Sequence, residues 1–115
     1  MRTVLVAACL SVVLAGCSSD SSNTSNPSQA CTSFVTAACD RLFACQPTAA
    51  AAAYGTAANC ATTLGTEANC STASCASGKS FNSGQAQTCL NDYKNQTCAA
   101  VEGATVPTSC NTVCQ

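Results

Sequence analysis

The chain has 115 residues, of which 12 are cysteine, none is histidine and only 8% are charged, with a formal net charge of −1. The absence of histidine excludes the usual general base, the Cys-His and Ser-His nucleophile pairs and imidazole metal ligands. The five acidic residues are scattered without a pair at helical spacing, which leaves a carboxylate dyad unsupported. Because no excess of basic residues is available to bind phosphate backbones, we expect no nucleic-acid partner.

The start of the chain has the organisation of a secretory signal. Arg2 gives a short positive segment, residues 4–14 form an apolar run too short to span a bilayer, and Ala15-Gly16 supplies the small residues that a signal peptidase needs. The tetrapeptide that ends at Cys17, Leu-Ala-Gly-Cys, resembles the lipobox of bacterial lipoproteins. That resemblance implies cleavage before Cys17 and its acylation. The alternatives are an ordinary cleaved signal or a buried core helix, with Cys17 as one more disulfide cysteine.

The number of cysteines favours the lipoprotein interpretation. Cys9 is removed with the signal and a lipidated Cys17 is blocked, which leaves ten of the 12 cysteines, an even number that can all pair. Two or three acyl chains anchor a protein stably, so we expect a mature protein that sits on a membrane without crossing it. By the sorting rule of better-studied lipoproteins, Ser18 permits export to the outer membrane, which predicts a cell-envelope location.

Three segments are predicted: a signal peptide at 1–16, a lipidated N-terminus with a flexible Ser- and Asn-rich tether at 17–30, and a cysteine-rich domain at 31–115. The domain has only 12 apolar residues larger than alanine and cysteine, with no Ile, Met or Trp. Such a core is too small to stabilise the domain without reinforcement. Because exported chains this rich in cysteine are usually disulfide scaffolds, we expect disulfides to supply that reinforcement.

The strongest helical pattern of the chain begins at the end of the tether. Asn26 is suited to cap the helix, Pro27 to its first position and Gln29 to a capping box. Pro47 should stop it, because the residue before a proline avoids helical dihedrals. The apolar stripe of this helix recurs every three or four residues, at Cys31, Phe34, Val35, Ala38, Leu42 and Cys45.

Shorter helices are predicted beyond it. A polyalanine helix over 48–54 should end at Gly55, and a helix capped by Thr56 should end at Gly65. Residues 71–81 are rich in Ser and Gly, which predicts a loop. No segment alternates with period two for long enough to predict a strand. We therefore expect an all-α fold, a small bundle of short helices stapled by about five disulfides.

A second clear helix follows the loop. Asn82 should cap it, Gln85 completes a capping box, and Phe81 is placed to pack on Ala86. Gly103 breaks the helical pattern, and a last helical turn should then present the two final cysteines on one face. The inward face of the second helix is predicted to carry Ala86, Cys89, Leu90, Tyr93 and Thr97.

The ten remaining cysteines are predicted to form five structural disulfides. No Cys-x-x-Cys occurs, which argues against zinc ribbons and thioredoxin-like redox sites, so we expect neither a metal site nor a catalytic residue. Cys31, Cys39 and Cys45 lie too far apart along one helix to pair with one another, so each must bridge to a different downstream segment. The connectivity is otherwise left open. The ten are Cys31, Cys39, Cys45, Cys60, Cys70, Cys75, Cys89, Cys98, Cys110 and Cys114.

Beside the lipobox and the tether, the chain carries Cys39 and Cys45 around Arg-Leu-Phe, then Pro47, Tyr54-Gly55 and Cys60. With these features it resembles the small cysteine-rich predicted lipoproteins that are numerous in myxobacteria and related soil bacteria. That resemblance implies an outer-membrane or secreted location and no known activity. Plant lipid-transfer proteins are a second comparison, but their Cys-Cys and Cys-x-Cys steps are absent here.

These features predict a non-enzymatic lipoprotein of the cell envelope, held on the membrane by its N-terminal lipid and serving as a structural or binding module. Its partner would be a protein or a small ligand, and no cofactor is expected. The alternatives are a carrier of a small apolar ligand, which an enclosed pocket of a few hundred Å³ or more lined by Phe and Leu would favour, and a thiol-disulfide redox protein. Tyr54 and Tyr93 are expected to belong to the core rather than to a ligand platform.

Overall fold

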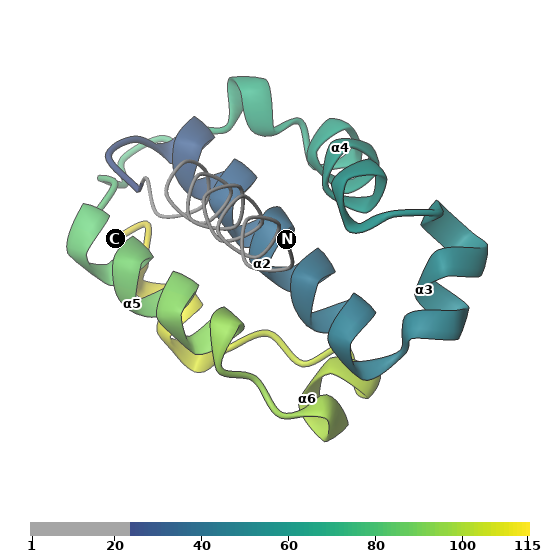
Figure 1. The fold of residues 1–115 in the computed structure, drawn as a ribbon. Coiled ribbons are helices and arrows are strands. Elements are labelled where there is room, and N and C mark those ends of the chain that lie inside the picture. The colour runs from purple at the N-terminus through teal and green to yellow at the C-terminus, as the bar shows by residue number, and fades with distance from the viewer. Residues whose placement is uncertain (1–23) are drawn as a thin grey trace, which may run out of the picture.

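The computed structural model describes residues 24–115, so the predicted signal peptide at 1–16, Cys17 and the start of the tether lie outside the described part. Within residues 24–115 the domain is helical and carries five disulfides, which confirms the predicted all-α, disulfide-stapled fold (Figure 1). The helices are α2 (Pro27–Cys45), α3 (Pro47–Tyr54), α4 (Ala57–Glu67), α5 (Ser83–Lys94) and α6 (Cys98–Glu102), with the 3₁₀ helices η1 (Cys70–Thr72) and η2 (Thr108–Thr112).

The long helix α2 lies at the centre of the domain. α4 packs along one of its flanks and α5 along the other, and α4 and α5 do not contact each other (Figure 1). α3, α6 and η1 also contact α2, whereas η2 packs on α5. The fold is therefore a central helix with its neighbours around it, rather than a bundle in which every helix touches the next.

The start and the end of α2 are those that the sequence predicts. The side chain of Asn26 accepts a hydrogen bond from the backbone N–H of Gln29 at 2.9 Å, and Pro27 occupies the first turn. The helix ends at Cys45, two residues before Pro47, which opens α3. Local capping and the position of prolines thus suffice to define the central element.

The folded part begins before the predicted boundary at residue 31. Thr24 is only 7% exposed, and its hydroxyl lies 3.2 Å from Oε1 of Gln87 and 3.4 Å from the carbonyl oxygen of Ser83, both on α5. Residues 24–30, which the sequence assigns to the tether, are therefore part of the domain. Their polar composition conceals this, because a helix cap and a hydrogen-bonded hydroxyl need no large apolar side chain.

The end of α3 and the start of α4 lie where the sequence predicts them, whereas α4 ends later than predicted. Gly55 follows α3 with a φ of 77°, and the side chain of Thr56 accepts a hydrogen bond from the N–H of Asn59 at 3.1 Å, as predicted. Gly65, however, does not end α4, which continues to Glu67. The left-handed residue that a helix end commonly needs is supplied four residues later by Asn69, with a φ of 53°.

α5 starts as predicted and is shorter than predicted. Asn82 caps it by accepting a hydrogen bond from the N–H of Gln85 at 3.0 Å, and the Phe81 ring packs against the buried cluster that contains Ala86. The helix ends at Lys94, so the prediction that Thr97 lies on its inward face is wrong. Thr97 is exposed and instead caps α6 by accepting a hydrogen bond from the N–H of Ala100 at 3.2 Å.

The final cysteines do not share one helical face. η2 carries Cys110, but Cys114 lies beyond it, in an isolated antiparallel bridge with Phe81. The backbone N–H of Ser80 donates to the carbonyl oxygen of Gln115 at 2.6 Å, and the N–H of Gln115 donates back at 3.1 Å. This backbone pairing holds the last residues extended against the 80–82 segment, so the predicted helical turn does not reach Cys114.

Small residues and cysteines make up most of the core. Of the larger apolar side chains in the domain, only Leu90 and Val113 are buried, and Val106 is 56% exposed. The fully enclosed volume is instead taken by alanines and half-cystines, among them Ala86, Cys39, Cys60 and Cys89. A core of this kind buries little apolar area per residue, which agrees with the need for covalent reinforcement inferred from the sequence.

Candidate functional site

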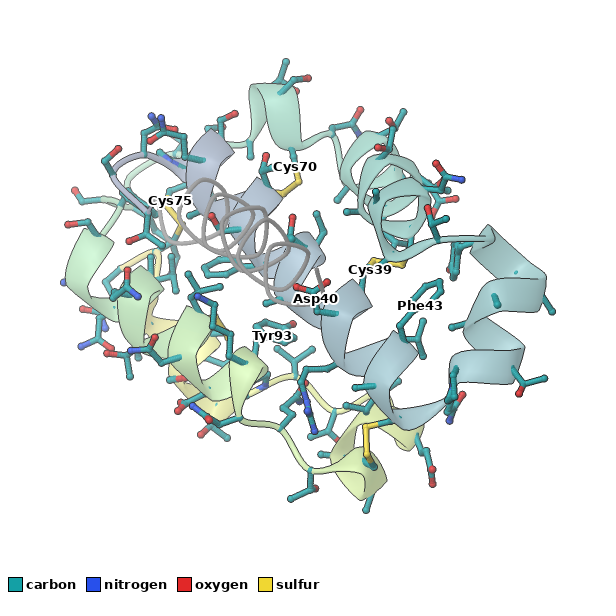
Figure 2. The ribbon with its side chains drawn as sticks, viewed as in Figure 1. Cys39, Asp40, Phe43, Cys70, Cys75 and Tyr93 are labelled. Atoms are coloured by element: carbon teal, nitrogen blue, oxygen red, sulfur yellow. A yellow bond between two sulfur atoms is a disulfide. The ribbon has the colours of Figure 1, made fainter. Side chains whose placement is uncertain are left out.

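Three disulfides join α2 to three different segments, as helix geometry requires. Cys31 bridges to Cys70 on η1, Cys39 to Cys60 on α4, and Cys45 to Cys98 on α6 (Figure 2). Their Cα–Cα distances are 5.2, 5.9 and 5.3 Å, within the usual range for bridged cysteines. The whole length of α2 is thereby fixed against its neighbours at near-regular intervals.

The other two disulfides hold the C-terminal segment in place. Cys89 on α5 bridges to Cys110 on η2, and Cys75 in the loop before α5 bridges to Cys114. All ten cysteines of residues 24–115 are therefore paired, and this part of the chain offers no free thiol as a nucleophile or a metal ligand. Cys17, the predicted lipidation site, lies outside the described residues.

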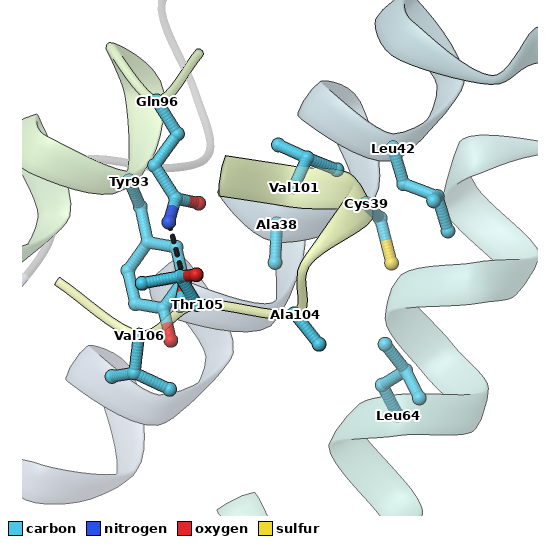
Figure 3. A pocket seen from close by; sticks show the side chains of 10 residues that line it. All are labelled: Ala38, Cys39, Leu42, Leu64, Tyr93, Gln96, Val101, Ala104, Thr105 and Val106. Atoms are coloured by element: carbon cyan, nitrogen blue, oxygen red, sulfur yellow. Dashed lines mark hydrogen bonds between the residues drawn. The ribbon is translucent and has the colours of Figure 1, made fainter. Parts of the chain in front are cut away.

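A small apolar hollow opens between α2, α4 and the segment that follows α6 (Figure 3). We call it the Tyr93 hollow; its volume is about 190 Å³. Leu42 and Leu64 lie on one side of it, and Tyr93, Gln96 and Thr105 on the other (Figure 3). Ala38, Val101 and Val106 complete most of the wall, together with the half-cystine Cys39.

Tyr93 forms the boundary between this hollow and the core. Its ring packs on Phe34 of α2, with 6.1 Å between ring centroids and 30° between the ring planes. Its hydroxyl makes no hydrogen bond to any of residues 24–115. Burial raises the pKa of Tyr93 above its usual value of 10.0, so the hydroxyl stays protonated at neutral pH. Tyr93 is thus half-buried against the core, and its polar end has no partner in the described domain.

The outer wall of the hollow is the segment between Gly103 and Val106. The side-chain amide of Gln96 donates to the carbonyl oxygen of Thr105 at 2.6 Å, which ties this segment to the end of α5 (Figure 3). Ala104 has a φ of 51°, a left-handed conformation that costs a non-glycine residue about 1 kcal/mol or more. The preceding Gly103 could adopt that conformation without strain, but it caps α6 with a φ of −79°.

A second apolar hollow lies at the other end of α2, beside Phe81. This Phe81 hollow has a volume of about 200 Å³ and is lined by Pro27, Phe34, Ala73 and Val113 among others. Of the two rings in contact, Phe34 borders the Phe81 hollow and Tyr93 borders the Tyr93 hollow. The contact between these rings therefore lies between the two hollows. Ser74 supplies the single hydroxyl group that borders the Phe81 hollow.

Arg41 is the one basic residue of α2, and it directly precedes Leu42, which lines the Tyr93 hollow. Its Nη2 donates to the carbonyl oxygen of Gln96 at 2.5 Å and lies 3.7 Å from Sγ of Cys45. Its Nε is buried and has no hydrogen-bond partner in the described residues. Arg41 does not line the hollow, and its hydrogen bond to Gln96 helps to position the end of α5.

The described residues contain few groups that could perform chemistry. Within residues 24–115, no cluster of three or more His, Cys, Asp or Glu side chains is arranged to hold a metal ion. None of the helices in this part of the chain combines the length and the apolar character needed to span a bilayer.

Sequence reasoning did not predict the Tyr93 hollow. Tyr93 was expected in the core because it falls on the apolar stripe of α5. Its ring does pack on Phe34, but the residue is only half-buried and also lines the hollow. The hollow itself depends on how the 103–106 segment returns past α2, which no local pattern encodes. The one signal that could have raised the question is the tyrosine itself, since its hydroxyl needs a partner when the ring is buried.

No protein-family model, curated protein or solved structure matches the chain.

Proposed function

We propose that this protein is a lipoprotein of the cell envelope, anchored through Cys17, whose domain is a non-enzymatic binding or structural module. The second half of this proposal is supported by the pairing of all ten cysteines of residues 24–115 and by the two apolar hollows on the surface of the domain. The first half rests on the lipobox and on the resemblance to small cysteine-rich lipoproteins, with the outer membrane as the expected destination.

The pattern of bridges supports a binding or display role over an enzymatic one. A disulfide framework keeps the geometry of a small surface fixed without a large core, so binding to that surface loses little conformational entropy.

The anchor is tested by metabolic labelling of the producing cells with radioactive palmitate, followed by fractionation. The wild-type chain should incorporate label and sediment with membranes, and the Cys17→Ala chain should lose the label and leave the membrane fraction. Cys9→Ala is the matched control, because Cys9 belongs to the predicted signal and its loss should change neither result. Unchanged labelling and sedimentation of the Cys17→Ala chain would show that the anchor is elsewhere.

A second candidate function is the carriage of a small apolar ligand, for which the Tyr93 hollow offers an apolar wall with two leucines, although it is open, contains no Phe and is smaller than the pocket expected of a carrier. Its wall is apolar except for three uncharged polar side chains, and two disulfides hold the residues around it, Cys39–Cys60 and Cys45–Cys98. A rigid, mostly apolar concavity with a few polar groups is the usual form of a small-molecule site. Saturable binding of a small apolar probe to the oxidised chain tests this candidate directly.

A further inference from the structure

We propose that the Tyr93 hollow binds a neutral small molecule whose apolar body is about the size of one six-membered ring and which carries a single hydroxyl group. This inference rests on the proposed function, because it assumes that the domain binds a partner rather than transforms a substrate. It adds to that function the place of binding and the chemical class of the ligand.

The volume of the hollow limits the size of the ligand. At about 190 Å³ it is slightly larger than the cavity of about 150 Å³ that accommodates one benzene ring. A ring with one short polar substituent therefore fills the hollow, and any larger part of a ligand would lie outside it.

The lining determines the polarity of the ligand. No charged side chain lines the Tyr93 hollow, so a charged ligand would lose its hydration without gaining a partner. Leu42, Leu64 and Val101 offer only apolar contacts to a ring. A neutral, mainly apolar body is therefore the form of ligand that this wall accepts.

The hydroxyl of the ligand is assigned by the unpaired polar group at one end of the hollow. The Tyr93 hydroxyl has no partner in residues 24–115 and remains protonated at neutral pH, so it can donate to a ligand oxygen. One N–H of the Gln96 side-chain amide donates to Thr105, so the Tyr93 hydroxyl is the group in the wall that has no protein partner. A hydroxyl group on the ligand can accept a hydrogen bond from the Tyr93 hydroxyl or donate one to it.

The Phe81 hollow provides an internal comparison. It has nearly the same volume, about 200 Å³, and its single bordering hydroxyl group is that of Ser74 rather than of a tyrosine. A ligand selected only for its apolar body would enter both hollows and be insensitive to Tyr93→Phe, whereas a ligand held by the Tyr93 hydroxyl should lose affinity in that variant. The two hollows therefore make the proposal testable within one molecule.

The test uses benzyl alcohol and toluene, which share a ring and differ in the hydroxyl group. The full chain carrying Cys9→Ser and Cys17→Ser, oxidised so that only the ten bridged cysteines remain, is titrated with each compound and followed by amide chemical shifts. We expect saturable shifts around Leu42, Val101 and Val106 with benzyl alcohol, and weaker binding of toluene. If no saturable shifts appear there with benzyl alcohol, the proposal is wrong.

Three variants locate the binding and the hydrogen bond. Tyr93→Phe keeps the ring and its packing on Phe34, and it should weaken benzyl alcohol binding by roughly three- to tenfold while leaving toluene unchanged. Ala38→Leu fills the Tyr93 hollow and should abolish binding of both compounds. Ala73→Leu fills the Phe81 hollow in the same way and should change neither.

Two results would overturn the proposal even if the chain binds. Equal affinities for the two compounds, unaffected by Tyr93→Phe, would mean that the site does not recognise the hydroxyl group of the ligand. Loss of binding in Ala73→Leu but not in Ala38→Leu would place the site in the Phe81 hollow. Both results are independent of the palmitate experiment, because the titrated chain carries no lipid, so failure of the ligand proposal and failure of the anchor are separable.

Discussion

The flank of α2 that faces α5 is held by packing, whereas the flank that faces α4 is held by disulfides. On the α5 side, Ala86 and Cys89 join the buried cluster, Leu90 is fully enclosed and Tyr93 packs on Phe34, yet no disulfide links the two helices. On the α4 side, two bridges reach α4 and η1, but no side chain larger than cysteine is buried there. Two of the three bridges of α2 thus lie on the flank where no larger apolar side chain is fully buried, whereas Cys89–Cys110 lies in the packed cluster itself.

The comparison explains how so few large apolar residues stabilise a domain. Phe34, Phe81 and Tyr93 pack against the buried cluster on the α5 flank, which contributes by burial. The α4 flank has the partly buried Leu64 but no buried side chain larger than cysteine, so it depends more on the loss of unfolded-state entropy that its bridges cause. The two mechanisms respond to different perturbations, burial to the loss of a side chain and chain entropy to the loss of a bridge.

Reduction of all five disulfides should have the largest effect. The helical circular dichroism signal should collapse, because the packed flank alone cannot offset the ordering entropy of the chain, about 1 to 2 kcal/mol for each backbone residue. Mass spectrometry of the same samples should find the oxidised chain about 10 Da lighter than the reduced chain, two hydrogens for each bridge. Helices that persisted with every thiol free would contradict the role assigned to the bridges.

Leu90→Ala should destabilise the packed flank by about 2 to 5 kcal/mol, because Leu90 is fully buried and its loss leaves a cavity. Denaturant unfolding of the oxidised chain measures this change. Val106→Ala is the matched control, since Val106 is 56% exposed and should shift the free energy of unfolding by about 0.5 kcal/mol or less. Similar effects for the two variants would mean that the cluster around α5 contributes little.

Removal of single bridges should separate the two flanks. Cys39–Cys60 and Cys89–Cys110 both span 21 residues, so chain entropy predicts the same loss for each pair replaced by alanine, about 3 kcal/mol. Hydrogen exchange should nevertheless differ. Without Cys39–Cys60, the amides of α4 should lose protection while those of α5 keep it, because little apolar packing remains to hold α4. Equal loss of protection in both helices would contradict the comparison.

Gly65→Ala should stabilise the α4 flank by about 0.5 to 1 kcal/mol, because alanine favours a helix interior over glycine. The added methyl group would meet Cγ2 of Val35 at 3.8 Å, an ordinary van der Waals contact. Gly55→Ala is the opposite case, since Gly55 has a φ of 77° and the substitution should destabilise by about 1 kcal/mol. Thermal unfolding of both variants checks that Gly65→Ala raises the stability of the domain and that Gly55→Ala lowers it.

The smallest expected effect is that of pH on the packed flank. Burial raises the pKa of Tyr93, so the folded state favours the neutral phenol, and the stability that this contributes is present below pH 10.0. It should be lost as the pH rises from the unfolded value through the higher folded one. Tyr93→Phe should remove this part of the alkaline decrease in the free energy of unfolding, and an unchanged pH profile in that variant would exclude Tyr93 as its source.

Elements defined by local rules could be predicted from the sequence. The caps at Asn26, Thr56 and Asn82 depend on the few residues that follow each of them, and each forms as expected. The same is true of the rule that no two cysteines of α2 can pair, which follows from helix rise alone.

What could not be predicted depends on contacts between distant segments. Gly65 and Thr97 were misassigned because a glycine or a threonine can either continue a helix or end one, and tertiary contacts decide which. The Tyr93 hollow arises where residues 101–106 pass α2, some 60 residues away in sequence. The choice of partner for each cysteine has the same non-local origin.

The attachment of Thr24 to α5 has a consequence for how the domain would stand on a bilayer. Only residues 18–23 separate Cys17 from this fixed point, so a lipidated Cys17 would hold the domain within about 25 Å of the headgroups, even with the leash fully extended. The part of the domain whose distance from the membrane is limited in this way is the start of α5, where the Thr24 hydroxyl meets Ser83 and Gln87.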